Sequence, residues 1–226
     1  MIRAVTIDAL GTLVRMHPPG PRLREQLRRV AGVEVSEEEA SAGFAAEISY
    51  YLEHHVEGNR EGLDELRNRC AAVLREALGL QEVDLALVRE AMLGALHFEA
   101  FPDAEPALRE VRSHGLRLVA ASNWDSSLPE VLERTGLAPL LDGVISSADA
   151  GATKPAPQLF RMALEVAEAE PDAALHVGDS PDKDVDGALA LGMRAVLIER
   201  DGGAPPGVTV PVITTLSQLP SLVLDA

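Results

Sequence analysis

Four short polar segments carry the residue types that are needed to attack a phosphate group. In chain order they are Asp8, the pair Ser122 and Asn123, Lys154, and the pair Asp179 and Asp184. A carboxylate nucleophile must overcome repulsion from a phosphate dianion, so its site needs cations. Lys154 can supply one positive charge, and Mg²⁺, which prefers carboxylate and carbonyl oxygen ligands, would offset the three carboxylates. The set therefore predicts phosphoryl transfer through an aspartyl intermediate.

Each of these residues has a distinct expected role in that chemistry. Asp8 is the expected nucleophile, because it follows an apolar run and is followed by a turn that contains Gly11. Ser122 and Asn123 are expected to donate hydrogen bonds to the transferred group, where charge must be stabilised in the transition state. Lys154, a point charge on a flexible stem, can reach both Asp8 and a substrate oxygen.

The polar segments require a scaffold that brings strand ends together. Short Val- and Leu-rich runs alternate with helical segments, which indicates a parallel sheet covered on both faces. Strands are predicted at residues 2–8, 116–121, 143–146, 174–178 and 194–198, and helices at 103–114, 126–135, 156–168 and 182–191. The fold class expected is α/β, with a Rossmann-like, doubly wound parallel sheet whose carboxyl edge carries the site.

A helical segment interrupts this pattern after the first strand. Prolines at positions 18, 19, 21 and 102 mark its two ends, and no strand signal lies between them. Helices are predicted at residues 22–30, 36–56, 63–78 and 84–96. We therefore expect an α/β core domain from residues 1–16 and 100–226, and an inserted helical cap domain from residues 17–99, placed over the strand ends.

Composition and charge restrict the partners of the chain. Acidic residues outnumber basic ones by 36 to 20, and the formal net charge is −16. Such a surface repels nucleic acid and anionic lipid, so neither is expected to bind. Cys70 is the single cysteine, no run is long enough to span a membrane, and no signal-peptide pattern is present. The expectation is a cytoplasmic monomer or homodimer that binds a small phosphorylated metabolite.

Three motifs resemble those of the haloacid dehalogenase superfamily. They are Asp-Ala-Leu-Gly-Thr-Leu at 8–13, Lys-Pro-x-Pro-x-x-Phe at 154–160, and Gly-Asp-Ser at 178–180 followed by Asp184. The last two resemble the phosphatase branch, and the helical insertion corresponds to a type C1 cap. The resemblance implies Mg²⁺ bound directly by Asp8, Asp179 and the backbone carbonyl of Leu10, with Asp184 acting through water.

Leu10 departs from the phosphatase motif, in which a second aspartate protonates the leaving group and then activates water. Leucine can do neither, so we expect weak or leaving-group-restricted hydrolysis of phosphomonoesters or acyl phosphates. Two alternatives remain. One is a metal-independent 2-haloacid dehalogenase, a class that also lacks this aspartate but does not need the retained pair Asp179 and Asp184. The other is a catalytically inert protein that binds a ligand or partner. Members that cleave carbon–phosphorus bonds use a cap lysine, and residues 17–99 contain none.

Overall fold

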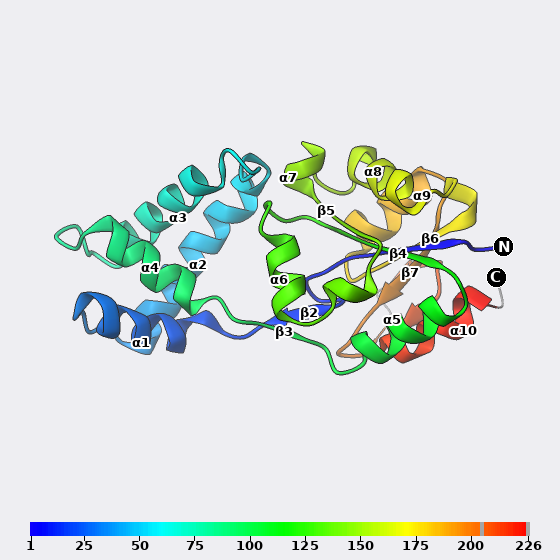
Figure 1. The fold of residues 1–226 in the computed structure, drawn as a ribbon. Helices are drawn as coiled ribbons and strands as arrows, with labels where there is room; N and C mark the ends of the chain where they lie inside the picture. The colour runs from blue at the N-terminus through cyan, green and yellow to red at the C-terminus, as the bar shows by residue number, and fades with distance from the viewer. Residues whose placement is uncertain (204–205, 225–226) are drawn as a thin grey trace. The chain divides into compact units, whose positions relative to one another are not determined.

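The computed structural model describes residues 1–203 and 206–224, and the chain divides into two compact units (Figure 1). The first, here called the sheet unit, consists of Met1–Arg15 and the described part of Glu99–Ala226. The second, here called the helical unit, is Met16–Phe98. The short strands β2 (Val14–Met16) and β3 (Phe98–Ala100) pair where the chain passes from one unit to the other.

A six-stranded parallel sheet forms the centre of the sheet unit. Its strands, in spatial order, are β5 (Gly143–Ser146), β4 (Arg117–Ser122), β1 (Ala4–Ile7), β6 (Ala174–Gly178), β7 (Arg194–Ile198) and β8 (Val212–Ile213). Every pairing between neighbours is parallel. From β1 the chain first adds strands on one side of the sheet, β4 and then β5, and afterwards on the other side, β6, β7 and β8. This architecture confirms the predicted α/β fold class.

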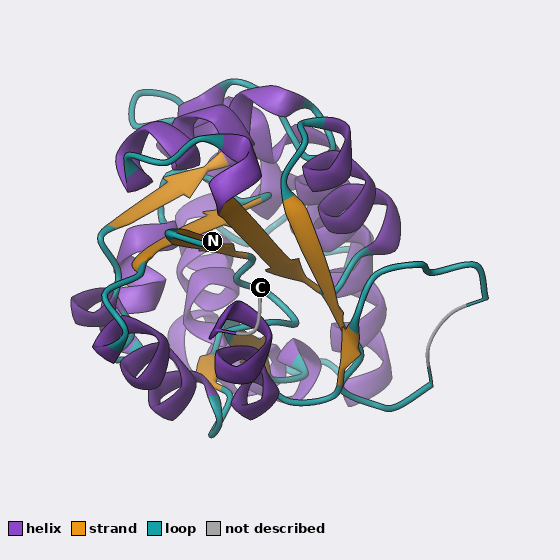
Figure 2. Cartoon of the chain, turned by 90° about the vertical axis from the view of Figure 1, so that its right-hand side faces the viewer, coloured by secondary structure: helices purple, strands orange, loops and turns teal. Residues whose placement is uncertain are grey.

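Helices cover both faces of this sheet (Figures 1 and 2). They are α5 (Ala104–Ser113), α6 (Leu128–Arg134), α7 (Ser147–Ala150), α8 (Pro157–Ala167), α9 (Asp186–Ala190) and α10 (Leu219–Leu224). The stripe Leu159, Phe160 and Ala163 of α8 packs with Val119 and Ala121 of β4. Burying one large apolar side chain contributes roughly 1.5–3 kcal/mol, so this stripe is enough to hold α8 on the sheet.

The predicted helix at 182–191 begins differently from the expectation. Pro181–Val185 form a wider π-helical turn, in which Asp184 and Val185 both donate their N–H groups to the carbonyl of Ser180, and α9 follows. The turn brings the Asp184 carboxyl group over Gly178, where a Cβ atom would lie 2.2 Å from Asp184 Cγ. Glycine at 178 therefore makes room for a carboxylate, which a side chain at that position would displace.

The helical unit contains four α-helices and no strand within residues 25–95, all of which the structure describes. They are α1 (Pro19–Ala31), α2 (Glu37–His54), α3 (Leu63–Ala77) and α4 (Leu85–Ala95), with a 3₁₀ turn at His55–Glu57. Ser36 and Glu39 form a capping box at the start of α2. Leu23, Phe44, Leu74 and Val88, one from each helix, meet in a shared core. That this unit caps the strand ends stays a prediction.

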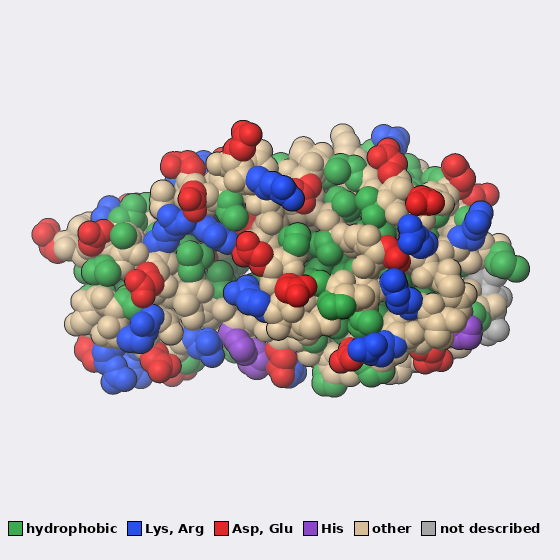
Figure 3. Space-filling view, viewed as in Figure 1, with side chains coloured by type: hydrophobic (Ala, Val, Ile, Leu, Met, Phe, Trp, Pro, Cys, Tyr) green, Lys and Arg blue, Asp and Glu red, His purple; other side chains and the backbone are tan. Residues whose placement is uncertain are grey.

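Acidic and basic side chains are interspersed on the face of the molecule that Figure 3 shows. None of the helices in the described part of the chain is long and apolar enough to cross a membrane.

Candidate active site

The carboxyl ends of three adjacent strands bring the predicted residues together within the sheet unit. In the sheet register, Ile7 of β1 lies beside Ala120 of β4 and Val177 of β6. Asp8 therefore leaves β1 at the same edge at which β4 ends and β6 passes into its loop. Parallel strands place their carboxyl ends on one side, and this is why segments more than 100 residues apart in the chain meet here.

Lys154 lies at the centre of this cluster and is 3% exposed. Its Nζ donates to Asp8 Oδ1 and to Asp184 Oδ1, each at 2.5 Å, and to the carbonyl of Ala121 at 3.0 Å. All three ammonium protons are thus used. The side-chain amide of Asn123 forms two hydrogen bonds with the Lys154 backbone. Its Oδ1 accepts from the Lys154 N–H at 2.7 Å, and its Nδ2 donates to the Lys154 carbonyl at 3.2 Å.

Asp8 is held through one of its two carboxylate oxygens. Oδ1 accepts from Ser122 Oγ at 2.9 Å as well as from Lys154. The backbone N–H of Asp8 donates to the carbonyl of Val177, which continues the hydrogen bonding between β1 and β6 by one residue. No donor among the described residues bonds to Oδ2. One oxygen is therefore fixed in place, while the other keeps its lone pairs for a ligand.

Asp184 is the most fully bonded carboxylate of the cluster. Its Oδ1 accepts from Lys154 and lies 2.9 Å from His176 Nε2, and its Oδ2 accepts from the N–H of Ser180 at 2.9 Å. His176 Nδ1 lies 2.8 Å from Thr6 Oγ1, so the imidazole satisfies both partners when Nε2–H donates to Asp184. His176 was not among the predicted site residues. In the structure, Thr6 and His176 are fully buried and paired in register, and the sequence signal for them is one polar residue within each of two apolar runs.

Asp179 lies at the rim of the cluster, with an exposed side chain that packs against the turn after Asp8. Gly11 has φ = +83°, and a Cβ there would lie 2.0 Å from Asp179 Oδ2. Glycine thus gives this turn both its left-handed backbone and its close approach to the carboxylate. Asp8, Asp179 and Asp184 each offer an oxygen within 4.8 Å of the others.

The electrostatics of the cluster show an excess of negative charge. Burial raises the pKa of Asp8 to about 6, and Asp184 and Asp179 add to the rise while Lys154 opposes it. Partial desolvation of its carboxylate and the neighbouring Asp184 also raise the pKa of Asp179. Burial acts on Asp184 as well, but Lys154 and His176 outweigh it and hold the pKa of Asp184 well below its usual range.

This donor set fits a divalent cation. One lysine faces three carboxylates, and desolvation together with the neighbouring carboxylates raises the pKa of Asp8 and Asp179. Oxygen ligands of this kind are what Mg²⁺ prefers. Asp8 and Asp179 keep oxygens for such an ion, whereas both oxygens of Asp184 already accept hydrogen bonds from the protein.

Leu10 occupies the turn between Asp8 and the short strand β2. Its backbone forms an isolated bridge with Val14, and its side chain is 43% exposed. Because residue 10 is a leucine, the turn at residues 9–13 has no acidic or basic side chain. The predicted roles of all the site residues stay predictions, although the structure brings Asp8, Ser122, Lys154, Asp179 and Asp184 into one cluster.

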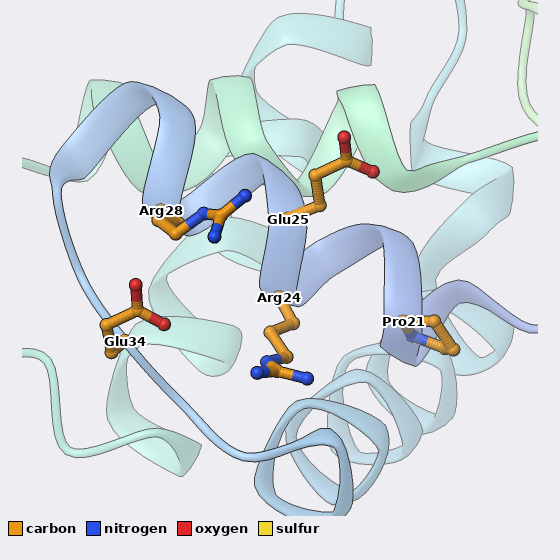
Figure 4. Close-up of a pocket in the computed structure, with 5 residues that line it drawn as sticks. All are labelled: Pro21, Arg24, Glu25, Arg28 and Glu34. Atoms are coloured by element: carbon orange, nitrogen blue, oxygen red, sulfur yellow. The ribbon is translucent and has the colours of Figure 1, made fainter.

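The helical unit has a separate surface hollow along α1, with a volume of about 270 Å³ (Figure 4). Its lining residues are Pro21, Arg24, Glu25, Arg28 and Glu34. All five are exposed, and the two arginines and two glutamates offset each other's charge. It lacks the apolar walls and the few directed polar groups that are typical of small-molecule sites.

Comparisons with known proteins agree with this fold. A family model described as haloacid dehalogenase-like hydrolase matches residues 2–192. Haloacid dehalogenase-like hydrolase domain-containing protein 3 of Bos taurus is 30% identical over 217 residues, which are 92% of this chain and 86% of that protein. Glyceraldehyde 3-phosphate phosphatase of Methanopyrus kandleri is 30% identical over 215 residues, covering 88% and 85%.

A solved structure adds a relative with a different activity. The 2-haloacid dehalogenase of Pseudomonas syringae matches with a TM-score of 0.72 and 28% identity, and the match covers 100% of this chain and 99% of that one. Phosphatases and dehalogenases thus both stand among the proteins that this chain is similar to. Because the family model spans most of the chain and a relative is 30% identical over 92% of it, the chain belongs to the haloacid dehalogenase-like hydrolase family.

Proposed function

We propose that the chain is a Mg²⁺-dependent hydrolase of a small phosphorylated metabolite, acting through an aspartyl-phosphate on Asp8. The observation that carries the proposal is the position of Lys154 Nζ, 2.5 Å from both Asp8 Oδ1 and Asp184 Oδ1, among three carboxylates. Similarity to phosphatases over most of the chain supports the same reaction class.

In the proposed reaction, Asp8 Oδ2 attacks phosphorus, and the bond from phosphorus to the leaving oxygen breaks. Lys154 and Ser122 hold Oδ1, which keeps the attacking oxygen in a fixed orientation. Water then cleaves the aspartyl-phosphate, which returns the Asp8 carboxylate and releases inorganic phosphate. Asp8, Asp179 and the Leu10 carbonyl would hold Mg²⁺, with Asp184 acting through water, and the ion would neutralise phosphate charge.

Asn123 has a further role in this proposal. Both functional groups of its side-chain amide are engaged with the Lys154 backbone. It therefore acts on the transferred group through the lysine it places. The positive charge of Lys154 would offset phosphate charge while its protons stay bonded to protein oxygens, and Ser122 holds Asp8 Oδ1.

Leu10 sets the expected preference among substrates. It offers no proton to the leaving oxygen, so an alkoxide would depart largely unprotonated, whereas a phenolate or a carboxylate can leave unaided. Hydrolysis is therefore expected to favour aryl and acyl phosphates over alkyl phosphates.

The test compares four compounds with and without Mg²⁺: p-nitrophenyl phosphate, acetyl phosphate, glycerol phosphate and chloroacetate. The expected result is Mg²⁺-dependent release of phosphate from the first two, which Asp8→Asn abolishes. Turnover retained within about tenfold in Asp8→Asn would exclude the covalent step, since a missing nucleophile costs far more. Absence of turnover with every compound would instead favour a binding protein.

Dehalogenation is the second candidate, because Leu10 removes the phosphatase acid and a dehalogenase of known structure is 28% identical. In that reaction Asp8 would displace halide from carbon, and no cation would be needed. Release of chloride from chloroacetate in the presence of a metal chelator would establish this activity and overturn the phosphatase proposal.

Leu10→Asp sharpens the assignment further. A positioned acid contributes about 10²–10⁴-fold, so this variant should increase glycerol phosphate turnover by a factor in that range and change p-nitrophenyl phosphate turnover much less. Circular dichroism checks that the variant is folded. Equal turnover of alkyl and aryl esters by the wild type would show that another group supplies the proton.

A further inference from the structure

Arg200 is a charged residue outside the predicted site whose contacts reach the turn after Asp8. It lies two residues beyond β7, and its side chain is 17% exposed. Nε donates to the carbonyl of Gly11 at 3.1 Å, and one terminal nitrogen donates to the carbonyl of Thr12 at 2.5 Å. The guanidinium group thus binds two consecutive carbonyls of one turn.

The rest of the guanidinium is fixed from other sides. Its second terminal nitrogen donates to both carboxylate oxygens of Asp103, at 3.1 and 3.2 Å, and its central carbon lies 3.5 Å from the ring centroid of Phe101. Asp103 Oδ2 in turn accepts from Thr215 Oγ1 at 2.6 Å and from the Leu216 N–H at 2.7 Å. Burial opposes ionisation, yet these bonds hold the pKa of Asp103 below its usual value.

The turn that Arg200 binds begins directly after Asp8 and lies against the Asp179 carboxylate. Within the turn, the N–H of Gly11 donates to the carbonyl of Val14, and the N–H groups of Thr12, Leu13 and Val14 donate to the carbonyl of Ala9. These bonds leave the carbonyls of Gly11 and Thr12 to Arg200. Because Gly11 lies directly against the Asp179 carboxylate, a shift of the turn would change the distance between Asp8 and Asp179.

We propose that Arg200 is a positioning residue, which fixes the turn at residues 9–13 and thereby the placement of Asp8 and Asp179 for turnover. It touches neither reacting atom, and its nitrogens reach two carbonyls and both oxygens of a carboxylate from one rigid plane, a geometry that the compact ammonium of a lysine does not reproduce. The proposal rests on the proposed function for its effect on turnover, but not for its effect on the turn.

Two measurements on Arg200→Met and Arg200→Lys test this role. The first is amide hydrogen exchange in peptides covering residues 9–14, compared with peptides from β4 in the same protein. The second is kcat and KM for p-nitrophenyl phosphate. Arg112→Met is the matched control, because Arg112 also donates to a backbone carbonyl, that of Leu140, and pairs with a carboxylate, that of Asp142.

We expect exchange at 9–14 to accelerate at least about tenfold in Arg200→Met while β4 changes little. Misplacement of reacting groups by about 1 Å costs about 10²-fold, so kcat should fall by that order, with KM within about threefold of the wild type. Arg200→Lys should lose less, and Arg112→Met should match the wild type in both measurements. Millimolar guanidinium should restore part of the kcat of Arg200→Ala.

Three results would overturn the positioning role. Equal acceleration at 9–14 and in β4 would mean that Arg200 stabilises the unit as a whole. An unchanged kcat despite local acceleration would mean that turnover does not depend on this contact. Unchanged exchange at 9–14 would mean that the turn does not need Arg200. If the wild type hydrolyses no phosphate ester, the proposed function fails, while the exchange measurement still decides whether Arg200 holds the turn.

Discussion

The sheet unit buries the carboxyl group of Asp184 and the helical unit buries that of Glu47, and the two groups have different kinds of hydrogen-bond partner. Asp184 in the sheet unit is 2% exposed and accepts hydrogen bonds from Lys154, His176 and the Ser180 N–H. Glu47 in the helical unit is 6% exposed, and its carboxyl group bonds to the Cys70 thiol. Burial is similar, but a cation is present in only one of these two sets of bonds.

The pKa values follow this difference in partners. Burial would raise the pKa of both groups, but Lys154 and His176 hold the pKa of Asp184 well below its usual range. Burial raises the pKa of Glu47 to about 7, and the Cys70 bond only partly opposes it. A buried acid is therefore no mark of a catalytic site in itself; the partner decides whether its charge is kept.

The largest effect is expected from removing that partner. Lys154→Met leaves Asp8 and Asp184 buried without their shared cation, and breaking such a pair typically costs about 3–5 kcal/mol. We expect a loss of this size in the free energy of unfolding, measured by urea denaturation at pH 7. Lys183→Met, which changes the other lysine of the chain, at an exposed position, is the control. A loss below about 1 kcal/mol in Lys154→Met would show that the cation is not needed for stability.

Glu47 should produce a pH dependence of stability. Its pKa is about 7 in the folded protein and near 4.5 when unfolded, so between these values the folded state binds more protons. Its contribution to stability is therefore fully present below about pH 4.5 and is lost as pH rises through about 7. The full difference is at most about 3 kcal/mol.

Glu47→Gln should remove that dependence and make the protein more stable than the wild type at pH 8. Urea denaturation at pH 5 and pH 8 measures it, with Glu53→Gln, an exposed position on the same helix, as the control. If Glu47→Gln loses stability equally at both pH values, the carboxyl group is not titrating in this window.

The smallest effect is expected from His176. His176→Leu leaves Asp184 Oδ1 bonded to Lys154 but removes the partner of the buried Thr6 Oγ1, so the cost should be that of one unsatisfied buried polar group, about 1–3 kcal/mol. Thermal or urea unfolding measures this cost, and Thr6→Val measures separately the loss of the bond between Thr6 Oγ1 and His176 Nδ1. A cost as large as that of Lys154→Met would mean that the imidazole, rather than the ammonium, keeps Asp184 charged.

The sequence predicted the strands that carry a clear apolar pattern, and polar residues that the structure brings into one cluster. Apolar runs located β1, β4, β5, β6 and β7. Polar residues at the ends of β1 and β4 led to Asp8 and Ser122, and Lys154 follows β5 and α7. The strand β8, with two residues, is too short to leave a periodic signal. Glu47, by contrast, has a periodic sequence signal, because it follows Ala40, Gly43 and Phe44 at helical spacing along the buried stripe of α2.

Arg200 left no signal of that kind. Its partners at Gly11, Thr12 and Asp103 lie about 100 or more positions away in the chain, and they include backbone carbonyls, which every residue type carries. A contact of this kind follows from the tertiary fold and cannot be inferred from residue type or spacing.

The strand order also determines when the site can form during synthesis. Strand β1 is made first, but its two neighbours are β4, about 110 residues later, and β6, about 170 residues later. The helical unit, by contrast, is one continuous segment and can fold as soon as residue 98 has emerged. A ribosome must therefore add most of the chain before the fully buried strand β1 finds both partners. Until then, its apolar residues Ala4, Val5 and Ile7 lack the strands that cover them in the folded protein.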